Sequence, residues 1–196
     1  MCIFGAVARF LNVDHDSSDP GVQNFEMNDL ARAGFAGDDV NAGYYLTATD
    51  GSPVYRIGRT FTSVQHRAFK YDTPANKAIP GTNYLAIPTK NSVTAAITGE
   101  NTPIDPDVAA STTLATQDAV VNGNWVDFTM DAVFADDDGS TNPISSMVYV
   151  EAPCDGTAVS GWAKTGAISL RQTAQEETTF KSIEILGYAP PGATVP

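Results

Sequence analysis

The densest run of potential metal ligands in the chain is residues 136–138, Asp136, Asp137 and Asp138, which Gly139 follows. Hard cations such as Ca²⁺ bind several carboxylate and carbonyl oxygens that converge from one loop. Placing Gly139 at the invariant glycine of an EF-hand loop puts Phe134 at its first ligand position and Ser145 at its last. Neither residue is a carboxylate, so the run is not an EF-hand. A calcium loop of another type and a solvated acidic turn both stay open.

A second group of ligand types is Asp14, His15 and Asp16, with Asp19 close behind. Alternate residues of an extended chain point to the same side, so Asp14 and Asp16 converge while His15 points away. That geometry does not favour one shared site, and we interpret the segment as an acidic surface loop. We therefore assign no metal site and expect no cofactor.

Catalytic patterns are missing from the chain. The two histidines are His15 and His66, and Ser160, in the stretch TAVSG, lacks the first glycine of a nucleophile elbow. Glycoside hydrolysis needs two carboxylates across a cleft, and the glutamates show no pattern that separates catalysis from solvation. The phosphate-binding patterns GxxxxGK[ST] and GxGxxG do not occur. We predict that the chain is not an enzyme.

The elements that would position any site are mainly strands. Apolar residues alternate with polar ones through residues 125–134, which predicts a strand with one buried side and one solvent-facing side. The same spacing recurs at residues 93–97, 148–150 and 183–185. Asp-Gly at residues 50–51 and Asn-Gly at residues 122–123 tolerate the positive φ angles of tight hairpin turns.

Helix signals are short. Residues 28–33 have a capping asparagine and a following glycine, and residues 107–115 are a second candidate that fits a loop equally well. No helical stripe persists for three turns, which excludes alternating βαβ architecture and helical bundles. We predict one all-β domain over residues 1–196, an antiparallel β-sandwich or jelly roll of about eight to ten strands with long loops and at most one or two short helices. Its extended termini would be an N-terminal arm (about 1–24) and a Pro-rich C-terminal tail (about 188–196).

Charge limits the partners. The chain has 23 acidic residues against 11 Lys and Arg, and the formal net charge is −12. Nucleic acids and anionic membranes attract clustered basic residues, so neither is an expected partner. Hydrophobic residues make up 42% of the chain, which is enough for a packed core.

Two cysteines, Cys2 and Cys154, stand at opposite ends of the sequence. They match no metal or redox spacing, and we interpret them as two reduced, partly buried thiols. The apolar start of the chain has no basic segment before it, and no Asn-X-Ser/Thr acceptor for glycosylation occurs. We therefore expect the chain to be made and folded in a cytoplasm.

The alternating segments VDFTMDAVF (126–134) and TFKSIEI (179–185) give the chain a general pattern that resembles the small β-rich proteins of tailed-phage particles. Capsid decoration (cement) proteins and tail-tube subunits are examples of this class. The resemblance implies a non-enzymatic virion structural protein that is assembled in the host cytoplasm, forms homo-oligomers and binds capsid or other virion subunits. A decoration or minor capsid protein is the favoured member of the class. A single-jelly-roll major capsid protein, a tail-tube protein, and a carbohydrate-binding or adhesion module stay open as alternatives.

Subunit contacts in this interpretation fall on the two ends of the chain, because an ordered Pro-rich terminus needs something to lie against. The apolar residues expected at the interface are Ile3, Phe4, Phe10, Tyr188, Pro190 and Pro191.

Overall fold

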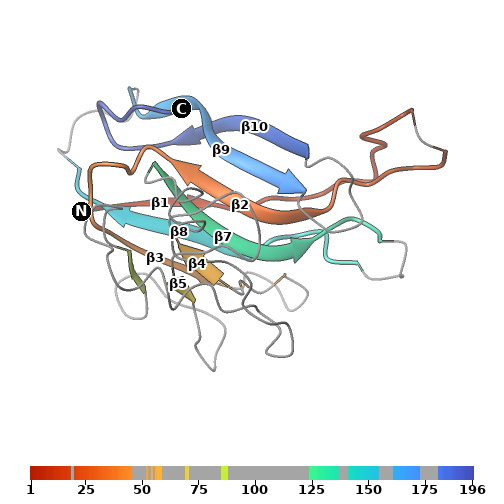
Figure 1. Cartoon of the computed structure of the whole chain (residues 1–196), viewed down its shortest axis with the longest axis horizontal. Coiled ribbons are helices and arrows are strands. Elements are labelled where there is room, and N and C mark those ends of the chain that lie inside the picture. Colours follow the sequence, from red (N-terminus) through yellow and green to blue (C-terminus); the bar gives the residue numbers. More distant parts are fainter. Residues whose placement is uncertain are drawn as a thin grey trace, which may run out of the picture.

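The computed structural model describes residues 1–18, 20–45, 52, 54, 56–58, 69–70, 85–87, 124–136, 141–154, 161–172 and 181–196. In these residues the protein is all-β, and two antiparallel sheets pack against each other as a sandwich (Figure 1). This confirms the predicted fold class. None of the described residues belongs to a helix long and apolar enough to cross a membrane.

Strands from distant parts of the sequence alternate within each sheet. The smaller sheet has the order β1-β8-β3-β6 and the larger sheet has the order β10-β9-β2-β7-β4-β5. The strands of the smaller sheet are β1 (Cys2–Ala6), β8 (Met147–Ala152), β3 (Val40–Tyr45) and β6 (Leu85–Ile87). Those of the larger sheet are β10 (Lys181–Tyr188), β9 (Ala163–Gln172), β2 (Met27–Ala33), β7 (Trp125–Ala132), β4 (Arg56–Gly58) and β5 (Phe69–Lys70).

The core lies between the two sheets. Val126, Phe128 and Met130 alternate along β7 and are all buried, as the sequence pattern predicts. They belong to one apolar cluster with Phe4 of β1 and Tyr149 of β8. Burying one such side chain stabilises the fold by about 1.5–3 kcal/mol. The cluster therefore supplies the main force that holds the two sheets together.

The prediction that β7 has a solvent-facing side is wrong. Asp127 and Thr129, which point away from the core, are 0% and 2% exposed. The reason is that β7 lies inside the larger sheet, between β2 and β4, and the outer face of that sheet is also covered in this region. Alternation shows which residues share a face, but not what lies over that face.

The helix predicted at residues 28–33 is also wrong, because this segment forms β2. Every residue of β2 is buried, and the strand pairs with β7 on one side and β9 on the other. A central position between two strands outweighs the helix propensity of its Ala, Leu and Arg residues. The other helix candidate (107–115), the strand expected at residues 93–97 and the two expected tight turns lie outside the described residues.

The C-terminal tail packs on its own chain. Val195 contacts a small apolar cluster of Ala31, Ala33 and Trp125 on the outer face of the larger sheet. Ala189 is fully buried, and its backbone N–H donates to the carbonyl of Trp162 at 3.0 Å. A neighbouring subunit is therefore not needed to order the Pro-rich end, contrary to the sequence-based expectation.

Gly34 allows this packing. Its φ of +97° is in the left-handed region, and a Cβ there would lie 2.7 Å from the Cβ of Ala189 and 3.2 Å from that of Ala193. We expect Gly34→Ala to lower the free energy of unfolding by about 2 kcal/mol, because backbone strain and a collision with the tail add. Urea denaturation measures the loss. Gly37→Ala is the matched control, since its added Cβ meets no atom within 4 Å, and it should change stability by less than about 0.5 kcal/mol.

Candidate functional site

In the described part of the chain, β1 and β6 are the edges of the smaller sheet, and β10 and β5 are the edges of the larger sheet. β1 and β10, here called the open strands, are the two edges whose side-chain exposure the structure describes. Among the described residues, β1 pairs only with β8, and β10 pairs only with β9. Large apolar side chains are exposed on both strands, with exposed fractions from 39% to 62%, and they are Ile3, Ile183, Ile185, Leu186 and Tyr188. Met1 before β1 and four residues of the loop after it are similarly exposed, namely Val7, Leu11, Val13 and Val22. Open strands with exposed apolar side chains are where a sheet protein most readily contacts another chain.

The larger sheet extends beyond the smaller one at β10. Ile183 and Ile185 lie opposite Leu170 and Ile168, and so share the core face of the sheet. Ile168 is 8% exposed, whereas Ile183 and Ile185 are 41% and 39% exposed. The smaller sheet therefore does not cover the core face of β10, and two isoleucines are left open there.

A buried arginine joins the two open strands. Arg32 of β2 is 0% exposed, and its guanidinium donates hydrogen bonds to the carbonyl of Phe4 at 3.0 Å and the carbonyl of Tyr188 at 2.9 Å. One side chain thus fixes the middle of β1 and the end of β10 relative to the centre of the larger sheet. Burial lowers the pKa of Arg32 to about 10, so the group remains charged at neutral pH.

The sequence-predicted interface residues separate into exposed and buried positions. Ile3 and Tyr188 are each 52% exposed. Phe4 belongs to the core, and Pro190 is buried against its own chain. Phe10 is half-buried and stacks on Phe25 with 6.5 Å between ring centroids. The sixth residue, Pro191, is half-buried in the tail. Of the six predicted residues, Ile3 and Tyr188 are therefore the most accessible to another molecule.

The residues of the expected N-terminal arm are divided between a strand and a loop. Residues 2–6 form β1, and residues 7–26 connect β1 with β2, projecting from one end of the sandwich at the right of Figure 1. Arg9 forms an isolated bridge with Ile144. The first part of the arm is thus built into the smaller sheet.

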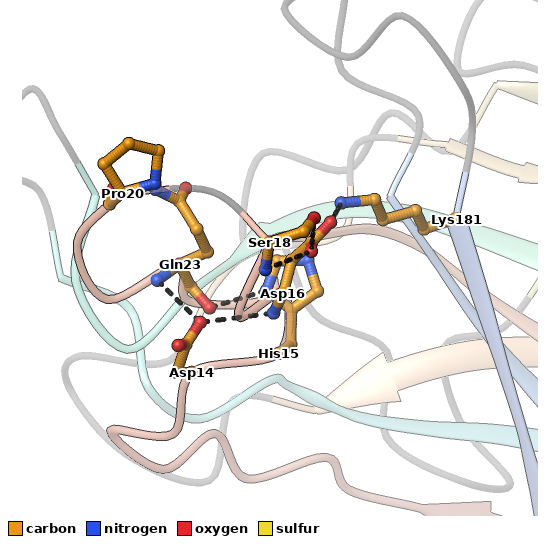
Figure 2. A network of polar contacts seen from close by, with 7 residues as sticks. All are labelled: Asp14, His15, Asp16, Ser18, Pro20, Gln23 and Lys181. Carbon is orange, nitrogen blue, oxygen red and sulfur yellow. Dashed lines mark hydrogen bonds and ion pairs between the residues drawn. The ribbon is translucent and has the colours of Figure 1, made fainter.

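Polar contacts within the projecting loop occupy its acidic residues (Figure 2). Asp14 accepts hydrogen bonds from the backbone N–H groups of Asp16 and Gln23, both at 3.2 Å. Asp16 accepts from the hydroxyl of Ser18 at 2.5 Å and forms an ion pair with Lys181 of β10 at 2.8 Å. The carboxylates therefore organise the loop and attach it to β10.

His15 also has a structural environment. Its Nδ1 lies 2.6 Å from the carbonyl oxygen of Gln23, and its ring forms a T-shaped pair with the ring of Phe25, with 5.6 Å between their centroids. Asp19 lies outside the described residues. No group of three His, Cys, Asp or Glu residues placed to hold a metal ion occurs in the described part of the chain. Of the acidic run at 136–138, Asp136 is half-buried, and Asp137 and Asp138 lie outside that part.

The attachment of Asp16 to Lys181 should depend on pH. The hydrogen bonds from Lys181 and Ser18 hold the pKa of Asp16 well below its ordinary value of 3.8. A lowered pKa means that the contact is complete above pH 3.8 and is lost only as the pH falls through the lower value. We expect Asp16→Asn to raise amide hydrogen exchange in residues 11–18 several-fold at pH 7. Global stability should change little, because solvent still reaches both side chains of the pair, which are 32% (Lys181) and 26% (Asp16) exposed. Glu184→Gln on the same strand is the control and should leave the loop unchanged.

A polar cluster on the outer face of the larger sheet was not predicted. Asp29 lies opposite Arg171 on one neighbouring strand and opposite Thr129 on the other, and the hydroxyl of Thr129 donates to Asp29 at 3.4 Å. Burial lowers the pKa of the Arg171 guanidinium, and the charge of Asp127 opposes that shift. The negative charges of Asp29 and Asp127 and the positive charge of Arg171 partly balance one another in this cluster. The signal in the sequence was the Asp, Thr and Arg content of three strands, but only their pairing brings these residues together.

The aromatic residues that a sugar-binding surface would need are dispersed. Tyr44 and Trp125 are buried, at 0% and 3% exposure. Trp162 is half-buried and packs on Phe4, with 5.8 Å between the ring centroids. Tyr45 is 39% exposed, and Tyr55 lies outside the described residues. The described aromatics therefore support packing more than a flat binding platform.

The candidate nucleophile Ser160 and the second histidine, His66, lie outside the described residues, so the structure does not describe any arrangement between them. No protein-family model, curated protein or solved structure matches this chain.

The sequence expectation of two reduced thiols is wrong. Cys2 and Cys154 form a disulfide with 5.7 Å between their Cα atoms. The pairing register of β1 with β8 brings Cys2 opposite Ala152, two residues before Cys154. The two cysteines, which are 152 residues apart in sequence, therefore meet because β1 and β8 are neighbours in the smaller sheet. The bond fixes the first residue of the open strand β1.

Proposed function

We propose that this chain is a non-enzymatic structural subunit of a virus particle, of the capsid decoration (cement) or minor capsid class. It acts by contact with neighbouring subunits. The observation that supports this most is the presence of exposed apolar side chains on β1, on β10 and in the loop after β1 of a strongly acidic protein. Their net negative charge makes free subunits repel one another, so contacts form on the parts of the surface that carry few charged side chains. A major capsid or tail-tube role would use the same surfaces.

The disulfide fits this function under one condition. Disulfides persist on virion surfaces and in other oxidising surroundings, but rarely in a reducing cytoplasm. A subunit that is assembled in the host cytoplasm would therefore carry free thiols at first. The bond between Cys2 and Cys154 would form after the particle is released.

Fractionation of a culture of the source organism tests the function. Particles are purified on a density gradient, and tryptic peptides of this chain are quantified by mass spectrometry in each fraction. A structural subunit is expected to sediment with the particles in fixed ratio to other particle proteins. Recovery only as free protein, in the medium or in cells, would contradict the proposal.

A carbohydrate-binding or adhesion module is the second candidate, and the disulfide favours it, because secreted β-sandwiches often carry such bonds. This candidate predicts that the purified monomer binds a glycan. A glycan array followed by calorimetry measures the binding. Glycan binding together with absence from particles would favour this module over the virion subunit.

A further inference from the structure

Arg32 is a buried cation that has no carboxylate partner among the described residues. Its side chain is 0% exposed, and its guanidinium donates to two backbone carbonyls, those of Phe4 and Tyr188. Its pKa is lowered by burial, with no opposing contribution from an acidic group in the described part of the chain. Arginine is almost never fully buried unless it is paired, because an uncompensated charge in the core is costly. A counter-ion is therefore expected beside Arg32.

The guanidinium also keeps one hydrogen-bond donor unused. The Nε–H of Arg32 is buried and meets no acceptor in the part of the chain that the structure describes. Nearly all buried N–H groups in proteins have an acceptor, and one that finds none in the protein is explained by a bound water or ion. Because Arg32 is charged, an anion satisfies both the donor and the charge, whereas a water satisfies the donor alone.

A second unused donor lies at the same end of the core. The indole Nε1–H of Trp162, the residue before β9, is buried and also meets no acceptor among the described residues. The ring of Trp162 packs on that of Phe4, with 5.8 Å between the centroids. Its carbonyl accepts from the N–H of Ala189, which directly follows Tyr188. Arg32 donates to Phe4 and to Tyr188, so both unused donors lie where β1 meets the end of β10.

We propose that the Nε–H of Arg32 and the indole N–H of Trp162 bind one small monovalent anion of the size of chloride. One guanidinium carries one positive charge, so a monovalent anion leaves the site neutral, whereas a divalent anion such as sulfate would leave a buried negative charge. The complete burial of Arg32 favours a small ion, because a large ligand would need the sandwich to open. The inference goes beyond the proposed function and does not depend on it.

The acidic character of the chain opposes this binding at long range. A net charge of −12 repels anions in solution, and dissolved salt screens that repulsion. The buried acidic residues Asp29 and Asp127 lie with Arg171 on the outer face of the larger sheet. Arg32 lies on the core face, since it pairs with Val126 of the apolar cluster. The charge nearest to the site is therefore the positive charge of Arg32 itself.

Thermal melting of the full chain, with its disulfide intact, tests the site at a fixed, high ionic strength in which sodium chloride replaces sodium gluconate stepwise. A fixed ionic strength keeps the screening constant, and gluconate is too large to reach a buried guanidinium. We expect the melting temperature to rise with chloride, because an anion that binds only the folded chain stabilises it. Above the dissociation constant, a tenfold rise in chloride should raise the folding equilibrium constant about tenfold.

Two matched tryptophan substitutions locate the site. Trp162→Phe keeps a ring that packs on Phe4 but removes the indole N–H, so chloride should bind about tenfold more weakly or not at all. Trp125→Phe makes the same change on the outer face of the larger sheet and should leave the response to chloride unchanged. Melting in gluconate alone shows whether both variants are folded.

Crystals grown in sodium bromide identify the ion directly, because bromide scatters X-rays anomalously. We expect one bromide within hydrogen-bond distance of Arg32 Nε and Trp162 Nε1. A water at that position, or a melting temperature that does not respond to chloride, would overturn the inference. An equal response to chloride in Trp162→Phe and in the wild type would show that the ion binds elsewhere and would also overturn it. These results are independent of recovery in particles, which tests the proposed function separately.

Discussion

Replacing Cys2 and Cys154 together with alanine is expected to lower the free energy of unfolding by about 5 kcal/mol. The two cysteines are 152 residues apart in sequence, so their bond closes a loop that contains most of the chain. The entropy that such a loop removes from the unfolded state corresponds to about 5 kcal/mol in the chain-entropy model. For a chain of this size the loss lowers the melting temperature by about 10–20 °C, measured by differential scanning calorimetry.

The wild-type chain in reductant is the matched control. It should melt at the same temperature as the double variant in buffer, and reductant should not change the variant further. A wild-type melting temperature that does not respond to reductant, with two thiols that react with a labelling reagent in the folded protein, would show that the bond is absent in solution.

Loss of the bond should act first on β1. This strand is open on one side, and Cys2 is its first residue. Strands with few neighbours exchange their amide hydrogens earliest, so residues 2–6 should lose protection before the rest of the sandwich. The bond that stabilises the whole chain therefore also holds the strand at the edge of the smaller sheet.

The local alternation of apolar and polar residues was sufficient to predict the fold class. Alternation located β7 and the apolar residues that face the core, because a strand exposes every second residue to the same side. It also located strands β8 and β10. These features depend on neighbours in the sequence, which a single chain displays directly.

Features that depend on pairing could not be predicted in this way. Asp127 looks solvent-facing in sequence and is buried, because the position of β7 within the larger sheet is set by strands that are distant in the chain. Cys2 and Cys154 look unrelated until β1 lies beside β8. Residues 28–33 have helix-capping signals at both ends and still form the centre of a sheet. In each case a tertiary contact outweighed the structure that the local sequence predicts.

The predicted interface residues show the same difference between what local sequence predicts and what tertiary contacts determine. Ile3 and Tyr188 were expected at an interface from their apolar character near the chain ends, and both are exposed on open strands. Phe4 and Pro190 have the same character but face their own chain. Composition alone does not separate the two pairs, because the separation arises from which side of a strand or tail meets the sandwich.

Arg32→Met is expected to lower the free energy of unfolding by about 2–4 kcal/mol. Methionine keeps most of the packing volume but donates no hydrogen bond, so the carbonyls of Phe4 and Tyr188 lose their charged donor. An unsatisfied buried acceptor costs about 1–3 kcal/mol, and this cost applies mainly to the carbonyl of Phe4, because the contact to Tyr188 is partly buried. Removing the buried charge offsets part of the loss. Urea denaturation measures the difference. Arg9→Met, at an exposed arginine, is the control and should change stability by less than about 0.5 kcal/mol.

Arg32→Lys distinguishes the role of charge from that of geometry. Lysine keeps the cation, but its single ammonium group does not reproduce the planar fork that reaches two carbonyls on different strands. We therefore expect a loss of about 1–2 kcal/mol, smaller than for methionine. Hydrogen exchange should rise in both β1 and β10, because Arg32 holds the two open strands to the centre of the larger sheet. A methionine variant as stable as the wild type, with unchanged exchange in both strands, would show that packing alone fixes them.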